Sequence, residues 1–457
     1  MAEPILSLAV NGREQQMSSK LIPFGVPRRA VRYGDGNRSE LSSVAIMGLG
    51  YVGLPTAAAL HGECARIIGI DVSEQRLAEI AALEADLSEP DRMRLKEALA
   101  EGTLELTTDQ SAVAAADAVI ICVPTPVDAE QTPDLAALRG ACASVVSHAH
   151  PGQVIILTST TYVGTTSELL TAPLAERGLM AGTNIHVAFS PERIDPGNPD
   201  HLQRETPRVV GGATPACTAR AAAVIERLTD AVYLVSSSDA AEATKLYENI
   251  FRAVSLALAN EFADACGALG LDPIEVTLAA ATKPYGFLGV FPGPGVGGHC
   301  IPCDPHYLLW QLGRDGRTSP LIEQAMRSIT LRPDRVTARA AELLEADGHE
   351  LAGSRVIVIG VSYKAGVRDL RESPALAILA GLIRAGADVS YHDPLCPDLR
   401  LPGGQQMHTV AAPQGADWDL AIVHTHQPDE DYSWVRDCPL VLDGTYQFDA
   451  VPHRTVV

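Results

Sequence analysis

The sequence predicts an α/β fold with two doubly wound units joined by a long helix. Three observations support this fold. Short apolar strands alternate with helices from residue 43, a proline-free helical stretch runs from Ser238 to about Leu269, and strand–helix–strand alternation returns at residue 355. Alternation of this kind is typical of parallel sheets covered by helices. At 457 residues the chain is also too long for one compact core, so we expect separate domains.

The first unit opens with the apolar strand Ser43–Met47, which runs into a glycine-rich turn over residues 48–53. A helix follows from about Leu54, and a second strand, Arg66–Ile70, ends at an aspartate. A strand, a GxGxxG turn, a helix, a strand and then an acid form the context that makes this fingerprint specific for a dinucleotide.

Each residue of this turn has an expected task. Gly48 permits the tight bend, Gly50 lets the backbone approach a pyrophosphate, and Gly53 allows close helix packing. Helix amides beginning near Val52 would hold the phosphates. Asp71 is placed to accept hydrogen bonds from the adenosine ribose hydroxyls, which favours NAD over NADP.

Further strands are expected over residues 118–123 and 154–158, before the long central helix. On that helix the apolar residues recur at helical spacing: Leu246, Ile250, Phe251, Val254, Leu258 and Phe262. A helix this long between two α/β units would span them and could supply a dimer surface.

The second unit is expected to begin with a helix after Arg332-Pro333, followed by a buried strand over residues 355–360. A helix over residues 374–385 and the strand Asp388–His392 continue it. Its first loop lacks a full GxGxxG, so no second dinucleotide is assigned to it.

A thiol ends the glycine-rich loop that precedes this unit, Gly293-Pro294-Gly295-Val296-Gly297-Gly298-His299-Cys300. Pro302 suits the first turn of a helix beginning just after Cys300, and a cysteine at a helix start has its thiolate favoured by the dipole. A hydride acceptor beside such a thiol can take an alcohol through an aldehyde to an acid. Cys300 and Cys303 could also be read as a metal or redox pair, but no second pair exists, so no metal is expected.

Lys245 and Asn249 are four residues apart and share one face of the long helix. Taken alone they are typical of a solvated lysine and a surface amide. Lys245 lies among apolar neighbours, however, and its face could meet the Cys300 loop. Glu192 lies in a proline-bounded loop after a strand and, taken alone, is an ordinary loop carboxylate.

Composition restricts the partners. A net charge of −21 argues against nucleic-acid binding, and no run approaches the roughly 20 apolar residues of a membrane span. Nine cysteines, mostly scattered through apolar segments, predict reduced thiols in a cytoplasmic protein. The first forty residues lack a periodic pattern and predict a flexible extension.

With these residues in view, the chain closely resembles the UDP-glucose/GDP-mannose dehydrogenase family of nucleotide-sugar 6-dehydrogenases. The resemblance runs from about Val44 to His392 and rests on several motifs in one order. They are the GLGYVGLP turn, Val123-Pro124-Thr125-Pro126, Ser159-Thr160, Ser190-Pro191-Glu192-Arg193, Lys245-x-x-x-Asn249, GPGVGGHCIP with Asp304, and Ser362-Tyr363-Lys364 through Asp369-x-Arg371-Glu372-Ser373-Pro374.

The resemblance implies an NAD-binding domain over residues 41–235, a central helical dimerisation domain with the cysteine loop over 236–335, and a nucleotide-sugar domain over 336–457. The extension before them would cover residues 1–40. It also implies oxidation of a sugar C6 hydroxyl to a carboxylate with two NAD and one water, in a homodimer.

The family's roles are carried over by position. The residues expected to be catalytic are Cys300, Lys245, Asn249, Asp304, Glu192 and Thr160. The residues expected to bind the cofactor are Gly48, Gly50, Tyr51, Val52, Gly53, Asp71, Arg76, Pro124, Thr125, Thr160 and Arg371. The residues expected to bind the substrate are Glu192, Arg193, Lys245, Asn249, Gly297, Tyr363 and Lys364.

Within the family, the SPERIDPGNP and TKPYGF segments look like the UDP-N-acetylglucosamine branch. Cys303 is unusual in that branch and in the glucose branch, and Asp443-Gly444-Thr445-Tyr446 lacks a basic residue often found there. The expected substrate is therefore a UDP- or dTDP-linked, gluco-configured sugar, either glucose or N-acetylglucosamine. Two alternatives stay open: a two-electron hydroxy-acid or 6-phosphogluconate-type dehydrogenase, and a non-catalytic NAD- or nucleotide-sugar-binding protein.

Overall fold

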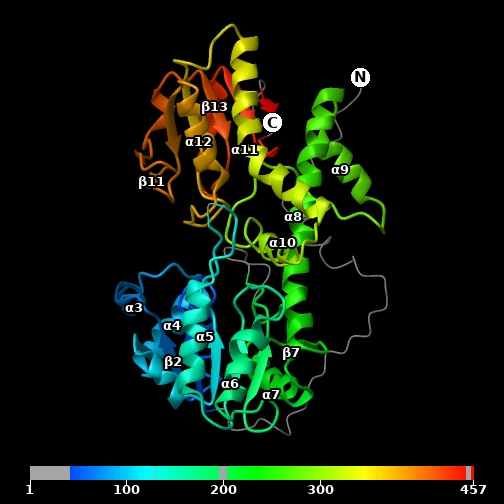
Figure 1. Ribbon diagram of the computed structural model, residues 1–457. Helices are drawn as coiled ribbons and strands as arrows, with labels where there is room; N and C mark the ends of the chain where they lie inside the picture. The colour runs from blue at the N-terminus through cyan, green and yellow to red at the C-terminus, as the bar shows by residue number, and fades with distance from the viewer. Residues whose placement is uncertain (1–41, 129, 195–202, 449–453) are drawn as a thin grey trace.

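The computed structural model describes residues 42–128, 130–194, 203–448 and 454–457 (Figure 1). The extension expected over residues 1–40 lies outside these residues, as does the 195–199 part of the proline-bounded loop. Two sheet domains lie at opposite ends of the molecule, with the long helix α8 running from one toward the other (Figure 1). Among the described residues, no helix is long and apolar enough to cross a membrane.

An eight-stranded sheet forms the N-terminal domain, in the order β3-β2-β1-β4-β5-β6-β7-β8. Its strands are β1 Ser43–Met47, β2 Arg66–Ile70, β3 Leu104–Thr107, β4 Ala118–Ile121, β5 Val154–Leu157, β6 His186–Phe189, β7 Arg208–Gly212 and β8 Val232–Leu234. All neighbours pair in parallel except β6 and β7, which are antiparallel. The central strands β1, β4 and β5 are buried at every residue, as their continuous apolar sequences predict.

The helices that cover this sheet are α2 Gly53–Ala59, α3 Glu74–Ala81, α4 Glu89–Ala100, α5 Ala136–His148, α6 Ala172–Glu176 and α7 Pro215–Ile225. Short turns occupy η2 Gln110–Ala115 and η3 Ser167–Thr171. Side-chain caps fix several helix starts: Ser73, Ser88 and Thr214 each accept a hydrogen bond from a backbone amide of the first turn.

The central region consists of α8 Ser238–Leu269, α9 Pro273–Ala281, α10 Asp304–Arg314 and α11 Pro320–Ala346. Ser237 caps the start of α8, and Gly270, at φ +69°, ends it in the left-handed region. The predicted apolar residues of α8 differ in exposure. Leu246 and Ile250 are buried, Val254 is partly buried, and Phe251, Leu258 and Phe262 are exposed.

Helix α11 corrects one prediction. The sequence placed a helix only after Arg332-Pro333, because proline is disfavoured in a helix interior. Instead α11 begins at Pro320 and continues through Pro333, and it bends along its length (Figure 1). The buried residues Ile329, Arg332 and Val336 surround this proline, so tertiary packing outweighs the missing backbone donor.

A five-stranded parallel sheet forms the C-terminal domain, in the order β10-β9-β13-β14-β15. Its elements are β9 Arg355–Ile359, α12 Pro374–Arg384, β10 Asp388–His392, β13 Leu420–Val423, β14 Leu440–Asp443 and β15 Arg454–Val456. The hairpin of β11 Asp398–Arg400 with β12 Gln406–His408 and the turns η4 Pro413–Gly415 and η5 Ser433–Asp437 complete it. The predicted α/β architecture with two parallel-sheet units is confirmed.

Candidate active site

The glycine turn after β1 has the geometry of a phosphate-binding loop. Gly48 has φ +91°, and a Cβ on Gly53 would lie 1.8 Å from the carbonyl oxygen of Gly48, so both positions require glycine. A Cβ on Gly50 would meet nothing within 4 Å, because this residue faces open space. The turn therefore leaves room for a pyrophosphate above Gly50, and Val52 immediately precedes α2 as expected.

Asp71 follows β2 and lies beside this turn. Its Oδ2 accepts a hydrogen bond from the Leu49 amide at 2.8 Å, and its Oδ1 accepts one from Ser73 at 3.0 Å. Arg76 donates from Nε to the Leu49 carbonyl oxygen at 3.0 Å. Both side chains are thus fixed by the backbone of the turn, next to the place where an adenosine ribose would lie.

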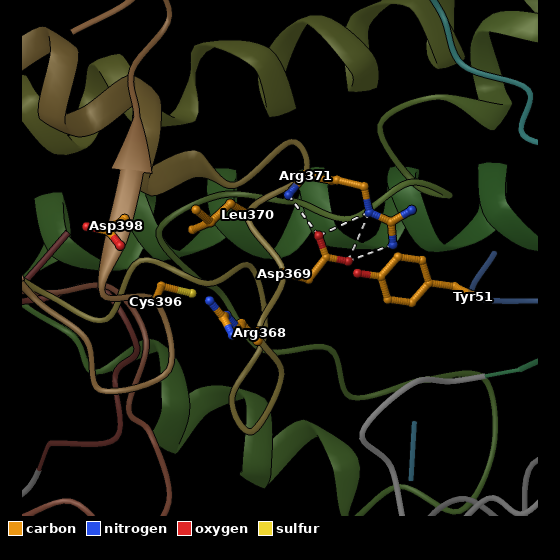
Figure 2. Close-up of a pocket in the computed structure, with 7 residues that line it drawn as sticks. All are labelled: Tyr51, Arg368, Asp369, Leu370, Arg371, Cys396 and Asp398. Carbon is orange, nitrogen blue, oxygen red and sulfur yellow. Dashed lines mark hydrogen bonds and ion pairs between the residues drawn. The ribbon is translucent and has the colours of Figure 1, made fainter. Parts of the chain in front are cut away.

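Arg371 brings the C-terminal domain to the cofactor turn. Its guanidinium carbon lies 4.0 Å from the centre of the Tyr51 ring, and its Nη2 donates to Asp369 at 2.6 Å (Figure 2). These residues line a cavity of about 450 Å³ together with Arg368 and Cys396. The predicted approach of Arg371 to the cofactor turn therefore has a structural basis.

Thr160 and Thr125 follow the carboxyl ends of β5 and β4, where ligands bind in open parallel sheets. Thr125, after Pro124, is 3% exposed. The loop after Thr160 is fixed by the buried Glu242 of α8, whose carboxylate accepts from the Gly164 amide at 2.6 Å and from the Thr166 amide at 2.8 Å.

Lys245 and Glu192 form a buried ion pair. Nζ of Lys245 lies 3.0 Å from Glu192 Oε1 and 3.1 Å from the Glu192 carbonyl oxygen, and Oε2 accepts from the Ile194 amide at 2.8 Å. Burial alone would raise the pKa of Glu192, but Lys245 and the Ile194 amide lower it below its usual value. Burial acts to lower the pKa of Lys245, yet Glu192, Cys300 and Asp304 raise it overall. Lys245 is therefore a cation and Glu192 an anion.

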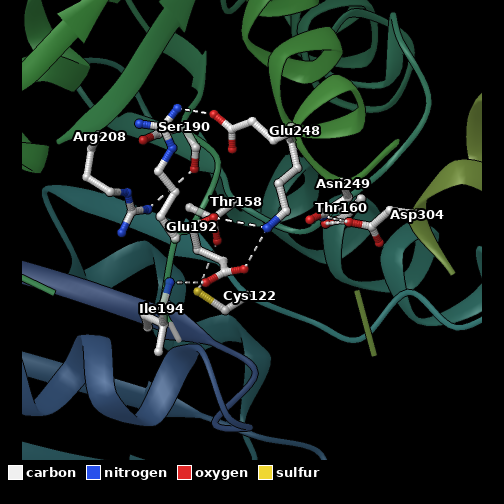
Figure 3. Close-up of polar contacts among 12 residues, drawn as sticks. Cys122, Thr158, Thr160, Ser190, Glu192, Ile194, Arg208, Glu248, Asn249 and Asp304 are labelled. Atoms are coloured by element: carbon white, nitrogen blue, oxygen red, sulfur yellow. Dashed lines mark hydrogen bonds and ion pairs between the residues drawn. The ribbon is translucent and has the colours of Figure 1, made fainter. Parts of the chain in front are cut away.

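A second polar cluster consists of Asn249, Asp304 and Thr160. It lies to the right of Glu192 in Figure 3. Asn249 Nδ2 donates to Asp304 Oδ2, and Thr160 Oγ1 donates to the same oxygen at 3.4 Å. Burial raises the pKa of Asp304 to about 7, against the opposing effects of Lys245 and Asn249. A carboxyl group with this pKa exchanges protons near neutral pH, as a general base must.

The position of Cys300 corrects the predicted helix start. Helix α10 begins at Asp304 with Pro305 in its first turn, so Pro302 lies in the turn before it and Cys300 is not the N-terminal residue. Burial raises the pKa of Cys300 to about 12, and the nearby Lys245 opposes this rise only in part. Desolvation thus favours the thiol form of Cys300, whereas the sequence predicted a thiolate favoured by the helix dipole.

The glycines before Cys300 serve packing against the C-terminal domain. A Cβ on Gly297 would lie 2.6 Å from the Tyr363 Cβ and 2.8 Å from the Glu372 carbonyl oxygen, and one on Gly298 would lie 2.9 Å from the Tyr363 ring. The Gly298 amide also donates to the Arg371 carbonyl oxygen at 3.0 Å. The motif Ser362-Tyr363-Lys364 therefore lies directly against the loop that carries the thiol.

Arg332 fixes the start of the same loop. It is 3% exposed, and its guanidinium bonds to the Gly293 carbonyl oxygen at 3.0 Å, to Asp264 of α8 at 2.7 Å and to Tyr446 Oη at 3.2 Å. The Gly293 amide donates to Asn260 Oδ1 at 2.9 Å. One buried arginine thus joins α8, α11, the cysteine loop and the C-terminal domain.

Two arginines near the site were not predicted from the sequence. Arg332 precedes a proline, which was read as a helix boundary, and Arg208 stands first in an apolar strand without any motif around it. Arg193, which was predicted, bonds to the Pro207 carbonyl oxygen at 2.8 Å and forms an ion pair with Glu248. The available signal for Arg208 was a charged residue at the start of a buried strand, a position that charges rarely occupy.

Three matches with protein families cover most of the chain. Residues 42–229 match the NAD binding domain, residues 239–328 the central domain, and residues 357–450 the UDP binding domain of the UDP-glucose/GDP-mannose dehydrogenase family. The fold and the site thus define a dehydrogenase in which a dinucleotide turn and a cysteine loop lie beside a nucleotide-binding domain.

The chain belongs to the UDP-glucose/GDP-mannose dehydrogenase family, and it is an NAD-dependent nucleotide-sugar dehydrogenase. It is 35% identical to the UDP-N-acetyl-D-mannosamine dehydrogenase of Salmonella typhi over 76% of this chain and 83% of that protein. The enzyme of the same name from Methanocaldococcus jannaschii is 34% identical, over 79% and 81% of the two chains.

Solved structures agree with this assignment. The UDP-N-acetyl-D-mannosamine dehydrogenase of Pyrococcus horikoshii superposes with a TM-score of 0.81 at 29% identity, covering 91% of this chain and 98% of that one. A UDP-glucose dehydrogenase from Pyrobaculum islandicum superposes with a TM-score of 0.78 at 26% identity, covering 94% and 98%. The predicted family, fold and NAD cofactor are confirmed.

Proposed function

We propose that this enzyme oxidises the C6 hydroxyl of a UDP-linked 2-acetamido sugar to a carboxylate in two hydride transfers, with a bond to Cys300 between them. The observation that carries the proposal is the pair of buried polar clusters, Lys245–Glu192 and Asn249–Asp304, around a thiol whose loop contacts Tyr363 of the nucleotide domain. The names of the similar enzymes support the acetamido group and the uridine base.

In the first oxidation, ionised Asp304 accepts the hydroxyl proton, directly or through a water molecule held with Lys245. The cation of Lys245 stabilises the alkoxide as it forms, and a donor of this kind typically contributes roughly 3 kcal/mol to the transition state. Bound NAD supplies the hydride acceptor for both oxidations, and the residues of the glycine turn, Asp71 and Arg371 would hold it.

In the second oxidation, the sulfur of Cys300 forms a bond to C6 of the aldehyde, and the thiol proton passes to the aldehyde oxygen through Asp304. The product is a thiohemiacetal. Asp304 then releases its proton to solvent while the cofactor is exchanged, and it accepts the hydroxyl proton as the second hydride leaves, which gives a thioester. Lys245 and Asn249 stabilise the oxygen that carries the developing negative charge. Covalent capture keeps the aldehyde in the site.

Hydrolysis completes the reaction. Glu192 is an anion beside Lys245 and is suited to direct a water molecule at the thioester carbon, with Thr160 nearby. The C–S bond breaks, the thiol of Cys300 regains a proton, and the sugar leaves as a carboxylate. Tyr363 and Lys364 would bind the base and the diphosphate throughout, beside Gly297, and Arg193 is a further predicted substrate contact.

A sugar panel tests the proposal. Production of NADH is measured with UDP-linked N-acetylmannosamine, N-acetylglucosamine, glucose and galactose, and with dTDP-glucose. We expect two NADH per sugar consumed and the highest kcat/KM for a UDP-linked acetamido sugar. A higher kcat/KM for UDP-glucose than for the acetamido sugars would favour the gluco-configured substrate. A higher kcat/KM for dTDP-glucose than for UDP-glucose would favour the thymidine base. One NADH per sugar would indicate a two-electron dehydrogenase, and binding without NADH a non-catalytic protein.

A further inference from the structure

The loop after β5 is held against α10 by Gln311, a side chain that none of the sequence motifs includes. Its Oε1 accepts a hydrogen bond from the Val163 amide at 3.0 Å, and its Nε2 donates to the Val163 carbonyl oxygen at 2.7 Å. One side-chain amide therefore bonds to both backbone groups of a loop residue, as a neighbouring strand would. A paired contact of this kind fixes where the loop lies along the helix.

The contacts between this loop and α10 have matching spacing. Thr160 Oγ1 donates to Asp304 Oδ2 at 3.4 Å, and three residues later Val163 bonds to Gln311. Asp304 and Gln311 are two helical turns apart, so they share one face of α10 and are separated by roughly 10 Å along its axis. Three residues of chain reach at most about 10 Å. The loop therefore has little slack between the two contacts, and the bonds to Gln311 place Thr160 level with Asp304.

The other end of the loop is bound to α8. Gly164, at φ +97°, turns the chain, and its amide donates to the buried carboxylate of Glu242 at 2.6 Å. Trp310, beside Gln311 on α10, adds an aromatic contact, because its ring centre lies 5.4 Å from that of Tyr162. The loop is thus bound to both helices that carry the candidate catalytic side chains.

We propose that Gln311 is a positioning residue, which sets the register of this loop on α10 so that the Thr160 hydroxyl meets the Asp304 carboxylate. A hydrogen bond donated to a carboxylate favours its ionised form. Without the bonds to Gln311 the loop shifts along α10, Thr160 loses this contact, and Asp304 holds its proton more tightly. The effect on proton transfer rests on the proposed function, whereas the register of the loop in the folded protein does not.

Hydrogen exchange of the full chain, without substrate or cofactor, tests the register. Gln311→Met keeps the length of the side chain but neither hydrogen bond, so the peptides that contain Val163 should exchange roughly tenfold faster than in wild type. Gln324→Met, at an exposed position of α11, is the matched control and should leave their exchange unchanged. Unchanged exchange in Gln311→Met would overturn the inference. Gln311→Ala removes the same bonds and serves as the second variant if Gln311→Met does not fold.

The second measurement is the pH dependence of kcat, which should rise as Asp304 loses its proton. The side chains that face this carboxyl are Lys245 and Asn249 of α8, Thr160, Glu192 after β6 and Cys300. Of these, Thr160 is the one on the loop that Gln311 holds. Gln311→Met should therefore move the acid limb to higher pH by roughly half a unit, because loss of a donor raises the pKa of the carboxyl. Thr160→Val should cause the same shift, and the double variant should show no further shift.

An unchanged acid limb in Gln311→Met would overturn the inference, because a purely structural role does not act on Asp304. Shifts that add in the double variant would also overturn it, since Gln311 would then act by a route other than Thr160. If no sugar yields NADH with the wild-type protein, the proposed function fails, and hydrogen exchange still decides whether Gln311 holds the loop.

Discussion

In the proposed reaction, the protonation of Cys300 sets the order of events. Desolvation raises the pKa of Cys300 to about 12, which favours the thiol over the thiolate before the sugar binds. The proton then leaves as the C–S bond forms, and Lys245, Asp304 and Glu192 are among the charged groups that act on the thiol. A reduced reactivity before substrate binding protects the thiol from adventitious electrophiles and oxidants.

Replacement of Cys300 by alanine should stop the reaction after the first oxidation. We expect kcat for the complete conversion to fall by at least about a thousandfold, since the covalent intermediate cannot form. The first hydride transfer needs only Asp304 and Lys245, so a single turnover should still yield one NADH per site. Stopped-flow absorbance measures this burst, and a full two NADH per site would contradict the role of Cys300. Cys266→Ala, at a buried cysteine of α8 away from the site, is the control.

Asp304 should govern the acid limb of the pH profile. Its pKa of about 7 means that it is protonated below neutral pH, so kcat should rise with pH through about 7. Asp304→Asn should lower kcat by roughly a hundredfold or more and remove this limb. A limb that persists unchanged in Asp304→Asn would assign it to another group.

The same pKa also affects stability. It is raised above the unfolded value, so the folded state holds its proton more tightly than the unfolded chain. The contribution of Asp304 to stability is therefore largest at low pH and is lost as the pH rises toward 7. Asp304→Asn should flatten the pH dependence of the urea midpoint in this range.

Sequence reasoning predicted which polar side chains meet better than it predicted their protonation. Lys245, Asn249 and Asp304 meet because helical spacing fixes the first two and the cysteine loop brings the third. The protonation of Cys300 could not be predicted, because it depends on the desolvation and the charges that the folded chain places around the thiol. Arg208 was missed because only the folded sheet shows that this strand residue is buried.

Among the elements, the cysteine loop is shaped by its neighbours more than by its own sequence. Gly293 is bonded at both its amide and its carbonyl, to α8 and to Arg332 of α11. Gly297 and Gly298 fit against Tyr363. The sequence predicted that these glycines allow close approach to a ligand. The structure shows their packing against the C-terminal domain, and the ligand role stays a prediction.

Gly297→Ala should therefore disturb the site through sterics. The new Cβ would lie 2.8 Å from the Glu372 carbonyl oxygen, a backbone atom that cannot rotate away. We expect a higher KM for the nucleotide sugar and a Tm lower by several degrees, as overpacking typically costs about 1–3 kcal/mol. Gly313→Ala in α10 is the matched control, because its Cβ meets nothing within 4 Å. Equal effects of the two substitutions on KM would contradict the packing role.

At the scale of the whole molecule, one face of α8 exposes apolar side chains that no other described residue of the chain covers. Tyr247, Phe251, Leu258 and Phe262 are 70%, 47%, 66% and 44% exposed. Large apolar side chains gathered on one surface mark interaction sites more often than chance exposure. We propose that a second copy of the chain covers this face, as the spacing on the helix predicted.

Leu258→Glu should weaken that association. A charge in the centre of an apolar interface is desolvated without a partner, which is unfavourable by several kcal/mol. Light scattering after size exclusion should show a dimer for wild type and a monomer for the variant. Leu321→Glu, at another exposed leucine on α11, is the control. A wild-type monomer at micromolar concentration would contradict the proposal.

The division of the chain into parallel-sheet units was accessible from sequence, because each unit repeats short apolar strands between helices. The path of α11 was not, because Pro333 is tolerated only through the packing around Arg332. Local propensity determines where an isolated helix begins, whereas tertiary contacts determine the start and path of α11.

The stacking of Arg371 on Tyr51 bears on how two dinucleotides are used in one catalytic cycle. In the proposed reaction, the reduced cofactor leaves and an oxidised one enters while the half-oxidised sugar stays behind. Because Arg371 of the C-terminal domain lies over Tyr51 of the glycine turn, we expect each exchange to separate these two residues. The covalent bond to sulfur would keep the sugar in place during that interval, so that the protein can open to its cofactor without losing its intermediate.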